Sequence, residues 1–133
     1  MLDFLEQEQI DPQVIAGIRG FRETYPPQEE AQTPPRYYYY GKEIWEQAAA
    51  ALLAGENLLL AGAKATGKNV LAENLAAAFG RSVFNVSLHI NADAASMLGT
   101  DTFRKGEVVF RPGPVYESAR RGGFCILDEI NMA

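Results

Sequence analysis

The chain has 133 residues, which is enough for one small domain. Apolar residues make up 47% of it and charged residues 22%, and this balance excludes wholesale disorder. The formal net charge of -5 does not favour DNA or RNA as the main partner, because proteins that bind the phosphate backbone carry a basic surface.

The N-terminal sequence, MLDFLEQEQIDP, carries acids and lacks the basic and apolar regions of a secretory signal. The longest apolar runs are too short to cross a bilayer. The single cysteine, Cys125, excludes an internal disulfide, and no Cys/His cluster indicates a zinc site. We therefore expect a soluble, cytoplasmic protein without a membrane partner.

The first 36 residues are predicted to be peripheral to the main body. Residues 1–23 carry an amphipathic helical pattern, with Asp11 placed as an N-cap and Pro12 at the first helical position. Residues 24–36 hold four prolines and few apolar residues, so they predict an extended linker. The main body is expected to cover residues 37–133.

Within the main body, the apolar period alternates between that of a helix and that of a strand. Helical patterns cover residues 42–54, 68–79, 93–98 and 114–121. Strand patterns cover residues 57–61, 81–88 and 123–128, and a glycine turn joins 102–104 to 108–110 as a hairpin. This alternation predicts an α/β fold with a parallel sheet.

A phosphate loop is predicted between the first of these strands and the helix that follows it. The pattern G-x-x-x-x-G-K is met by Gly62, Ala63, Lys64, Ala65, Thr66, Gly67 and Lys68. Glycine freedom lets the backbone turn its N–H groups inward, and the helix N-terminus favours an anion. Lys68 adds a cation that reaches the β- and γ-phosphates. A chance glycine–lysine turn is the alternative, and the flanking strand and helix make it the less favoured one.

Asn69 departs from the phosphate-loop pattern, which has Ser or Thr after the lysine to ligate Mg²⁺. Its amide oxygen is an acceptable ligand for a hard cation, on a longer and differently angled side chain. We expect weakened or rearranged metal binding, with phosphate binding less affected.

A second acidic site is predicted where the last apolar strand, residues 124–127, runs into Asp128 and Glu129. Ligands of parallel sheets gather at the carboxyl ends of the strands. Asp128 is therefore a candidate Mg²⁺ ligand, and Glu129 is a candidate to orient and deprotonate the attacking water. The alternative is an acidic pair that only ends a strand at the solvent. Its distance from the phosphate loop favours the functional interpretation.

Four segments together resemble the MoxR and dynein-related branch of AAA+ ATPases: GAKATGKN at 62–69, MLG at 97–99, RPGPV at 111–115 and FCILDEINMA at 124–133. The resemblance covers residues 37–133. It implies a P-loop NTPase fold that binds ATP and Mg²⁺, with the phosphate loop as Walker A and Asp128 and Glu129 in Walker B. It further implies a homo-oligomeric ring, commonly a hexamer, that remodels or activates a protein client, in several members with a von Willebrand A domain partner.

The same resemblance assigns roles to individual positions. It implies phosphate binding by residues 62–69, Mg²⁺ support by Asp128 with Asn69, and water activation by Glu129. A polar residue that restrains the catalytic Glu falls at Ser87, with Asn85 as the second choice. The hairpin over 102–110 matches an insertion that tends to face the pore of the ring. The sequence departs from the branch at Ala65, often glycine there, and at Asn69.

The sequence ends just after the acidic pair, before the sensor residue, arginine finger and helical lid that the resemblance implies. We therefore expect a fragment, truncated after the Walker B strand, with little ATP hydrolysis of its own. The branch places a further strand between the strand at 57–61 and the strand at 123–128. Without it, these two must pair directly, borrow a strand or leave open edges.

Two other features allow more than one interpretation. Residues 37–40 are four tyrosines, which either pack on the sheet, the favoured interpretation, or flank an adenine. His89 has no partner at a telling spacing, so a surface or structural role is favoured over catalysis.

A scaffold that holds ATP without turnover is the alternative to an ATPase, and Asn69 keeps it open. A small P-loop kinase is disfavoured, because no arginine-rich lid is visible.

Overall fold

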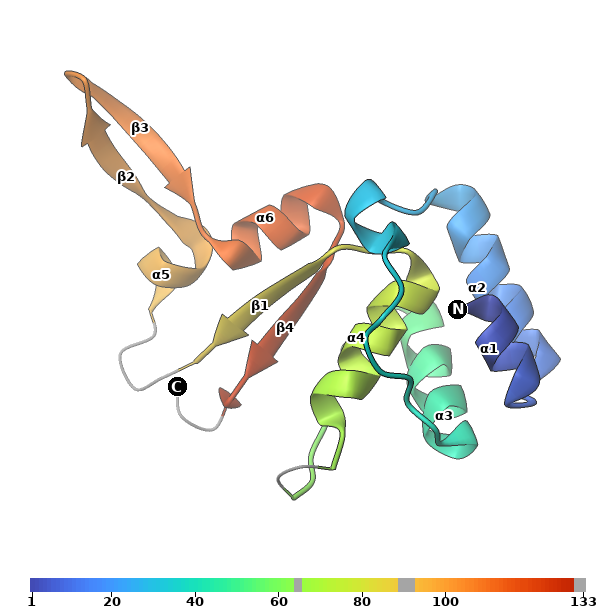
Figure 1. The fold of residues 1–133 in the computed structure, drawn as a ribbon. Helices are drawn as coiled ribbons and strands as arrows, with labels where there is room; N and C mark the ends of the chain where they lie inside the picture. The colour runs from blue at the N-terminus through green and yellow to red at the C-terminus, as the bar shows by residue number, and fades with distance from the viewer. Residues whose placement is uncertain (64–65, 89–92, 131–133) are drawn as a thin grey trace. The chain divides into compact units, whose positions relative to one another are not determined.

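The computed structural model describes residues 1–63, 66–88 and 93–130, and the chain forms two compact units. The first unit is Met1–Arg81 and the second is Ser82–Ala133 (Figure 1). Both α/β character and a parallel strand pair are present, as the sequence predicts. Within the described residues, no helix has the length and apolarity that a membrane span requires.

The first unit is helical throughout its regular structure. Its elements are α1 (Leu2–Gln7), α2 (Pro12–Thr24), the 3-10 helix η1 (Glu29–Gln32), α3 (Lys42–Leu53) and α4 (Lys68–Phe79). Asp11 caps α2 as predicted, because its carboxylate accepts a 2.8 Å hydrogen bond from the Gln13 N–H. The pattern over residues 1–23 thus forms two helices, and α2 packs against α1, α3 and α4.

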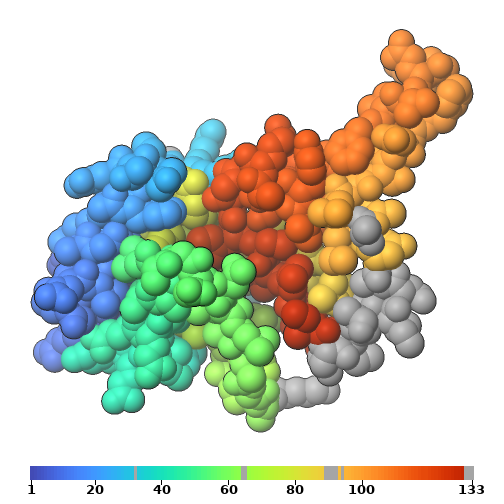
Figure 2. Space-filling model, turned by 180° about the vertical axis from the view of Figure 1, so that it is seen from behind, coloured from blue at the N-terminus to red at the C-terminus, as the bar shows by residue number. Residues whose placement is uncertain are grey.

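The core of the first unit lies among these four helices. On the face seen in the space-filling view, blue α1 and α2 and turquoise α3 lie against one another (Figure 2). Apolar side chains from every helix are buried below it: Leu5, Ile10, Ile15, Ile18, Trp45, Ala48, Ala49, Leu71, Leu75, Ala76, Ala78 and Phe79. Burial of this apolar surface is the main force that holds the short helices together.

The predicted extended linker is wrong in part. Residues 24–36 include η1, and their backbone is tied to the end of α4. Gln28 N–H donates to the Gly80 carbonyl at 2.9 Å, and the Arg81 guanidinium donates to the Pro26 carbonyl at 2.7 Å. These hydrogen bonds attach the backbone of the segment at two points just after the end of α4.

The predicted strand at 57–61 is also wrong. These residues form no regular secondary structure: within the described chain they belong to no sheet, and Leu59 is 77% exposed. A strand requires a partner backbone, and an apolar run alone does not supply one.

The second unit is a parallel strand pair joined to a hairpin. Its elements are β1 (Val83–Ser87), α5 (Ala94–Leu98), β2 (Gly99–Arg104), β3 (Glu107–Pro112), α6 (Pro114–Arg121) and β4 (Phe124–Asp128). Strands β1 and β4 are parallel, and the register runs from Val83 opposite Phe124 to Ser87 opposite Asp128. Helix α6 packs on both strands. Parallel neighbours need such a crossover, and α6 is its last part.

The predicted hairpin is confirmed and projects from the rest of its unit (Figures 1 and 2). It turns at Lys105 and Gly106, which both have positive φ, as two-residue hairpin turns require. All six residues of β3 are exposed, Val108 and Phe110 among them.

A pair of leucine substitutions tests this description of the first unit. Leu75→Ala removes a side chain that is 2% exposed in the core, so it should lower the free energy of unfolding by about 2–5 kcal/mol. Leu59→Ala, on the open segment, should change it by less than about 0.5 kcal/mol. Urea denaturation measures both. A loss for Leu59→Ala as large as that for Leu75→Ala would show that the segment is buried in solution.

Candidate functional site

The phosphate loop ends in a helix N-terminus that no side chain caps. Helix α4 begins at Lys68, and its N-cap residue is Gly67, which has φ +86° and ψ 19°. This left-handed conformation is easy for glycine and costly for other residues. The first N–H groups of a helix lack partners within the helix, and here no side-chain cap hydrogen bond is present among the described residues. They are therefore oriented to bind an anion.

Lys68 lies over the phosphate loop. Its ammonium donates hydrogen bonds to the carbonyls of Gly62 at 2.6 Å and Ala63 at 3.3 Å. The Thr66 hydroxyl also donates to the Ala63 carbonyl, at 2.8 Å. Within the described part of the chain, no carboxylate pairs with Lys68, so its positive charge is not neutralised. Phosphate oxygens would replace the weaker carbonyl acceptors.

Of the three remaining residues of the predicted phosphate site, the structure describes only Asn69. Lys64 and Ala65 lie outside the described residues. Asn69 is exposed in the first turn of α4, and its amide makes no hydrogen bond with any described residue. The amide oxygen of Asn69 is thus accessible to an external ligand such as a hydrated cation.

The acidic pair follows β4 directly. The Asp128 carboxylate accepts a 2.9 Å hydrogen bond from the N–H of Glu129, which has φ +56°. Glu129 is exposed, and its left-handed backbone turns the chain away from the strand direction. Non-glycine residues adopt such a backbone uncommonly, and they cluster at functional sites.

Ser87 is the register partner of Asp128 on β1, and both are in the second unit. No hydrogen bond joins Ser87 to Glu129 among the described residues, so the proposed restraint of Glu129 remains a prediction. Asn85 lies opposite Ile126, two residues before that position. His89 lies outside the described residues.

Two ionisable groups of the second unit have shifted pKa values. Partial burial raises the pKa of the Cys125 thiol, which agrees with a small, unreactive residue of the strand. The Glu117 carboxylate, at 2.8 Å, raises the pKa of the Arg120 guanidinium. Arg120 and Arg121 end α6, where cations are favoured by the helix dipole.

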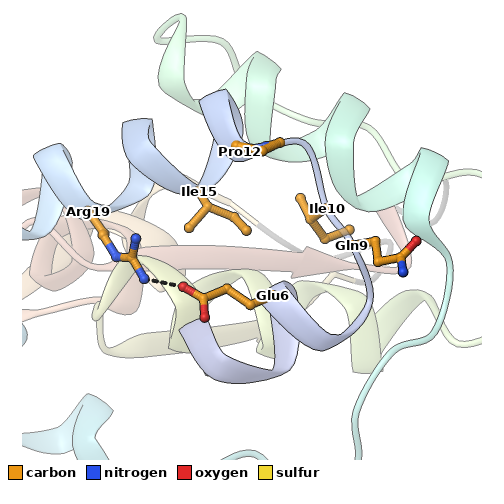
Figure 3. A pocket seen from close by; sticks show the side chains of 6 residues that line it. All are labelled: Glu6, Gln9, Ile10, Pro12, Ile15 and Arg19. Carbon is orange, nitrogen blue, oxygen red and sulfur yellow. Dashed lines mark hydrogen bonds and ion pairs between the residues drawn. The ribbon is translucent and has the colours of Figure 1, made fainter.

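A hollow between α1 and α2 is a poor alternative site (Figure 3). No residue of the phosphate loop lines it, and the guanidinium of Arg19 is paired with the carboxylate of Glu6. A charge that is already paired offers little to an anionic ligand. The residues that line the hollow are Glu6, Gln9, Ile10, Pro12, Ile15 and Arg19.

Sequence reasoning missed Asn74 of α4, a fully buried amide that hydrogen-bonds to the tyrosine segment at 37–40. Its signal was a polar residue on the apolar face of the predicted helix, beside Leu71 and Leu75. A buried amide needs partners, but the sequence does not say which ones.

Residues 57–133, more than half of the chain, match the AAA domain of the dynein-related subfamily. The chain therefore belongs to this family, and the resemblance stated from its motifs is confirmed. The family match includes the phosphate loop, α4 and the whole second unit.

The chain is also similar to several bacterial proteins. An uncharacterised protein of Staphylococcus haemolyticus is 36% identical over 97 residues, which are 69% of this chain and 37% of that protein. YojN, an uncharacterised protein of Bacillus subtilis, is 36% identical over 62% of this chain and 29% of its own length. Protein NorQ of Paracoccus denitrificans is 35% identical over 55% of this chain and 27% of its own length. The chain thus spans about a third of the length of these relatives.

A pair of glycine substitutions tests the conformation of the phosphate loop. Gly67→Ala should lower the free energy of unfolding by about 1–2 kcal/mol, because alanine is strained at φ +86°. Gly20→Ala, within α2 and with no atom within 4 Å of its new methyl group, should raise it by about 0.5–1 kcal/mol. Thermal or urea unfolding gives both values. Changes of the same sign in the two variants would contradict the left-handed assignment of Gly67.

Proposed function

We propose that the chain is the nucleotide-binding part of an AAA+ ATPase that works in a ring and remodels or activates a protein client. The observation that carries this proposal is the start of α4. In the part of the chain that the structure describes, its N-terminus has no side-chain cap, and Lys68 beside it lacks a carboxylate partner. Such an arrangement suits a phosphate group, and the family match supports ATP as its source.

The phosphate-binding residues of this proposal are the whole loop and the residue after it. The backbone N–H groups and the Lys68 ammonium hold the phosphates, so side-chain identity matters little at most loop positions. The residues are Gly62, Ala63, Lys64, Ala65, Thr66, Gly67, Lys68 and Asn69.

Asp128 and Asn69 are the proposed protein ligands of Mg²⁺, Asp128 through water. Within the described residues, no group of three or more His, Cys, Asp or Glu side chains forms a metal cluster. Proteins bind Mg²⁺ through one or two side chains, waters and the phosphates of the nucleotide. When bound, the ion neutralises charge that develops on the phosphates.

Glu129 is the proposed general base. It is exposed, so a water molecule can reach its carboxylate. The hydrogen bond from its N–H to Asp128 fixes its backbone next to the proposed metal ligand. A carboxylate in this role accepts a proton from the attacking water. Ser87 is proposed to restrain Glu129 before the client is engaged.

The proposed assembly is a ring, commonly a hexamer, with a von Willebrand A domain protein as the proposed partner. Its support is the AAA family match and the resemblance of the motifs. The net charge of -5 supports a protein client over nucleic acid. The chain spans about a third of its relatives, which supports a longer protein with the sensor, arginine finger and lid elsewhere.

A second candidate function is a scaffold that holds ATP and does not hydrolyse it. One observation favours it: Asn69 occupies the position of the metal-ligating hydroxyl, so the geometry of the metal site is altered. Phosphate binding by the backbone and Lys68 does not depend on that side chain.

Nucleotide binding can be tested by thermal unfolding of the chain with and without Mg-ATP. At about 100 times the dissociation constant, the ligand should add about 2.7 kcal/mol to the free energy of unfolding. Lys68→Ala should abolish most of this gain, because it removes the cation of the loop. Lys42→Ala, an exposed lysine at the start of α3, is the matched control and should keep the gain. Equal shifts for both variants would overturn the role of Lys68.

Turnover separates the two candidate functions and requires the full-length protein. An ATPase should lose about 10²- to 10⁴-fold in kcat on Glu129→Gln, because the general base is removed. Nucleotide affinity should be retained. A steady-state phosphate-release assay measures the rate. A native protein without turnover that gains it on Asn69→Thr would instead identify the scaffold.

A further inference from the structure

The four tyrosines at residues 37–40 form an extended strap along α4, and they lie outside the family match at 57–133 (Figure 1). We call residues 37–40 the tyrosine strap. It belongs to the first unit, as does the phosphate loop. It runs into α3, and its tyrosines differ in exposure: Tyr37 and Tyr40 are 60% and 70% exposed, whereas Tyr39 is half-buried.

Asn74 fixes the tyrosine strap to α4. Its amide oxygen accepts a hydrogen bond from the Tyr39 N–H at 3.0 Å. Its amide nitrogen donates to the carbonyls of Tyr37 at 2.8 Å and Val70 at 2.9 Å. Asn74 is fully buried, and a buried amide is costly without partners. The strap supplies two of these three partners, so it is required at this place on α4.

Trp45 of α3 holds Tyr39 through a second hydrogen bond, at its carbonyl. Its indole N–H donates to the Tyr39 carbonyl at 2.8 Å, and the indole is fully buried. Both backbone groups of Tyr39 are therefore bonded to buried side chains, one from α4 and one from α3. This double anchoring leaves the Tyr39 backbone little freedom.

The anchored backbone places the Tyr39 ring against the last glycine of the phosphate loop. A methyl group at Gly67 would lie 3.3 Å from Cε2 of Tyr39, which is tight packing. The ring also lies against Gly41, where a methyl group would be 2.8 Å from Cε1. Gly67 is the N-cap of α4 and holds the left-handed conformation on which the loop depends.

We infer that Tyr39 is a positioning residue for phosphate binding, because its ring, anchored by Asn74 and Trp45, limits the conformations of Gly67. The inference rests on the proposed function. An isolated glycine samples many conformations, and ordering it on ligand binding costs entropy. The ring restricts this sampling before the ligand arrives, so the loop binds phosphate more tightly.

The competing interpretation is that the Tyr39 ring is ordinary packing. Packing alone predicts that loss of the ring lowers stability and leaves the affinity of the folded chain unchanged. Positioning predicts that affinity falls in a chain that is still folded. Affinity and folding must therefore be measured on the same variants.

The experiment measures binding of a fluorescent ADP analogue to the full chain by anisotropy, with circular dichroism to confirm folding. Tyr39→Ala should weaken binding by about tenfold, the size expected when preorganisation is lost. Tyr39→Phe should restore native affinity, because the ring is kept and the hydroxyl bonds to no described residue. Tyr40→Ala is the matched control: its ring contacts Phe4 at 5.3 Å and makes no contact with Gly67. It should bind ADP as the native chain does.

Fluorescence supplies a second readout. Trp45 is the single tryptophan of the chain, and its indole is bonded to the strap. ADP should change its emission in the native chain and in Tyr40→Ala, and this response should be lost in Tyr39→Ala. If Tyr39→Ala proves unfolded, Tyr39→Leu keeps apolar bulk without the flat ring and should show the same two losses.

The outcomes distinguish this inference from the proposed function. If the native chain binds ADP, Lys68→Ala does not, and a folded Tyr39→Ala or Tyr39→Leu binds as tightly as native, the positioning role is refuted and the nucleotide site stands. If Tyr40→Ala weakens binding as much as Tyr39→Ala, the contact with Gly67 is not the cause and the inference is also refuted. If the native chain binds no ADP, both fall.

Discussion

The first unit depends on the requirement that a buried amide be fully hydrogen-bonded. Asn74 lies in the interior of α4, where a polar side chain is unfavourable unless it has partners. It finds them 35 and 37 residues earlier in the chain, on the backbone of the tyrosine strap. This one side chain therefore fixes the position of the strap on α4, the helix that follows the phosphate loop. The strap in turn brings Phe4 of α1 into contact with Tyr38, at a ring separation of 4.6 Å, so the N-terminal helix joins the same core.

The second unit is organised by a different constraint, which is the pairing of two parallel strands. The backbone ladder between β1 and β4 is extended at both ends, by a hydrogen bond from the Phe124 N–H to Ser82 and one from the Leu88 N–H to Asp128. The acidic pair lies at the carboxyl end of this ladder, where a strand stops and its last side chains become accessible. The pairing thus ends at the residues for which metal binding and water activation are proposed.

Local signals in the sequence predicted the helices well and the strands less well. The bounds of α4 and α6 follow from the glycine after each helix and, for α6, from Pro114 at its start. The strand predicted at 57–61 did not form, because a strand is a property of two segments and an apolar run describes only one. The hydrogen-bond partners of Asn74 and the anchoring of Tyr39 could not have been found from the sequence. Their hydrogen bonds join residues more than 30 positions apart, and no residue pattern records such a pairing. The roles of the phosphate loop and the acidic pair remain predictions from motif and resemblance.

The hydrogen bonds between the tyrosine strap and Asn74 also limit where the chain can be cut without exposing or unsatisfying buried groups. The family match begins at residue 57, and a boundary drawn there separates α4 from the backbone that satisfies Asn74. The severed piece would contain an amide that has lost two of its three hydrogen-bond partners. Gene fusion or domain shuffling that transfers the nucleotide module intact must therefore carry the tyrosine strap and α3 with it. In this chain, the segment that keeps the hydrogen bonds of Asn74 is longer than the segment that matches the family.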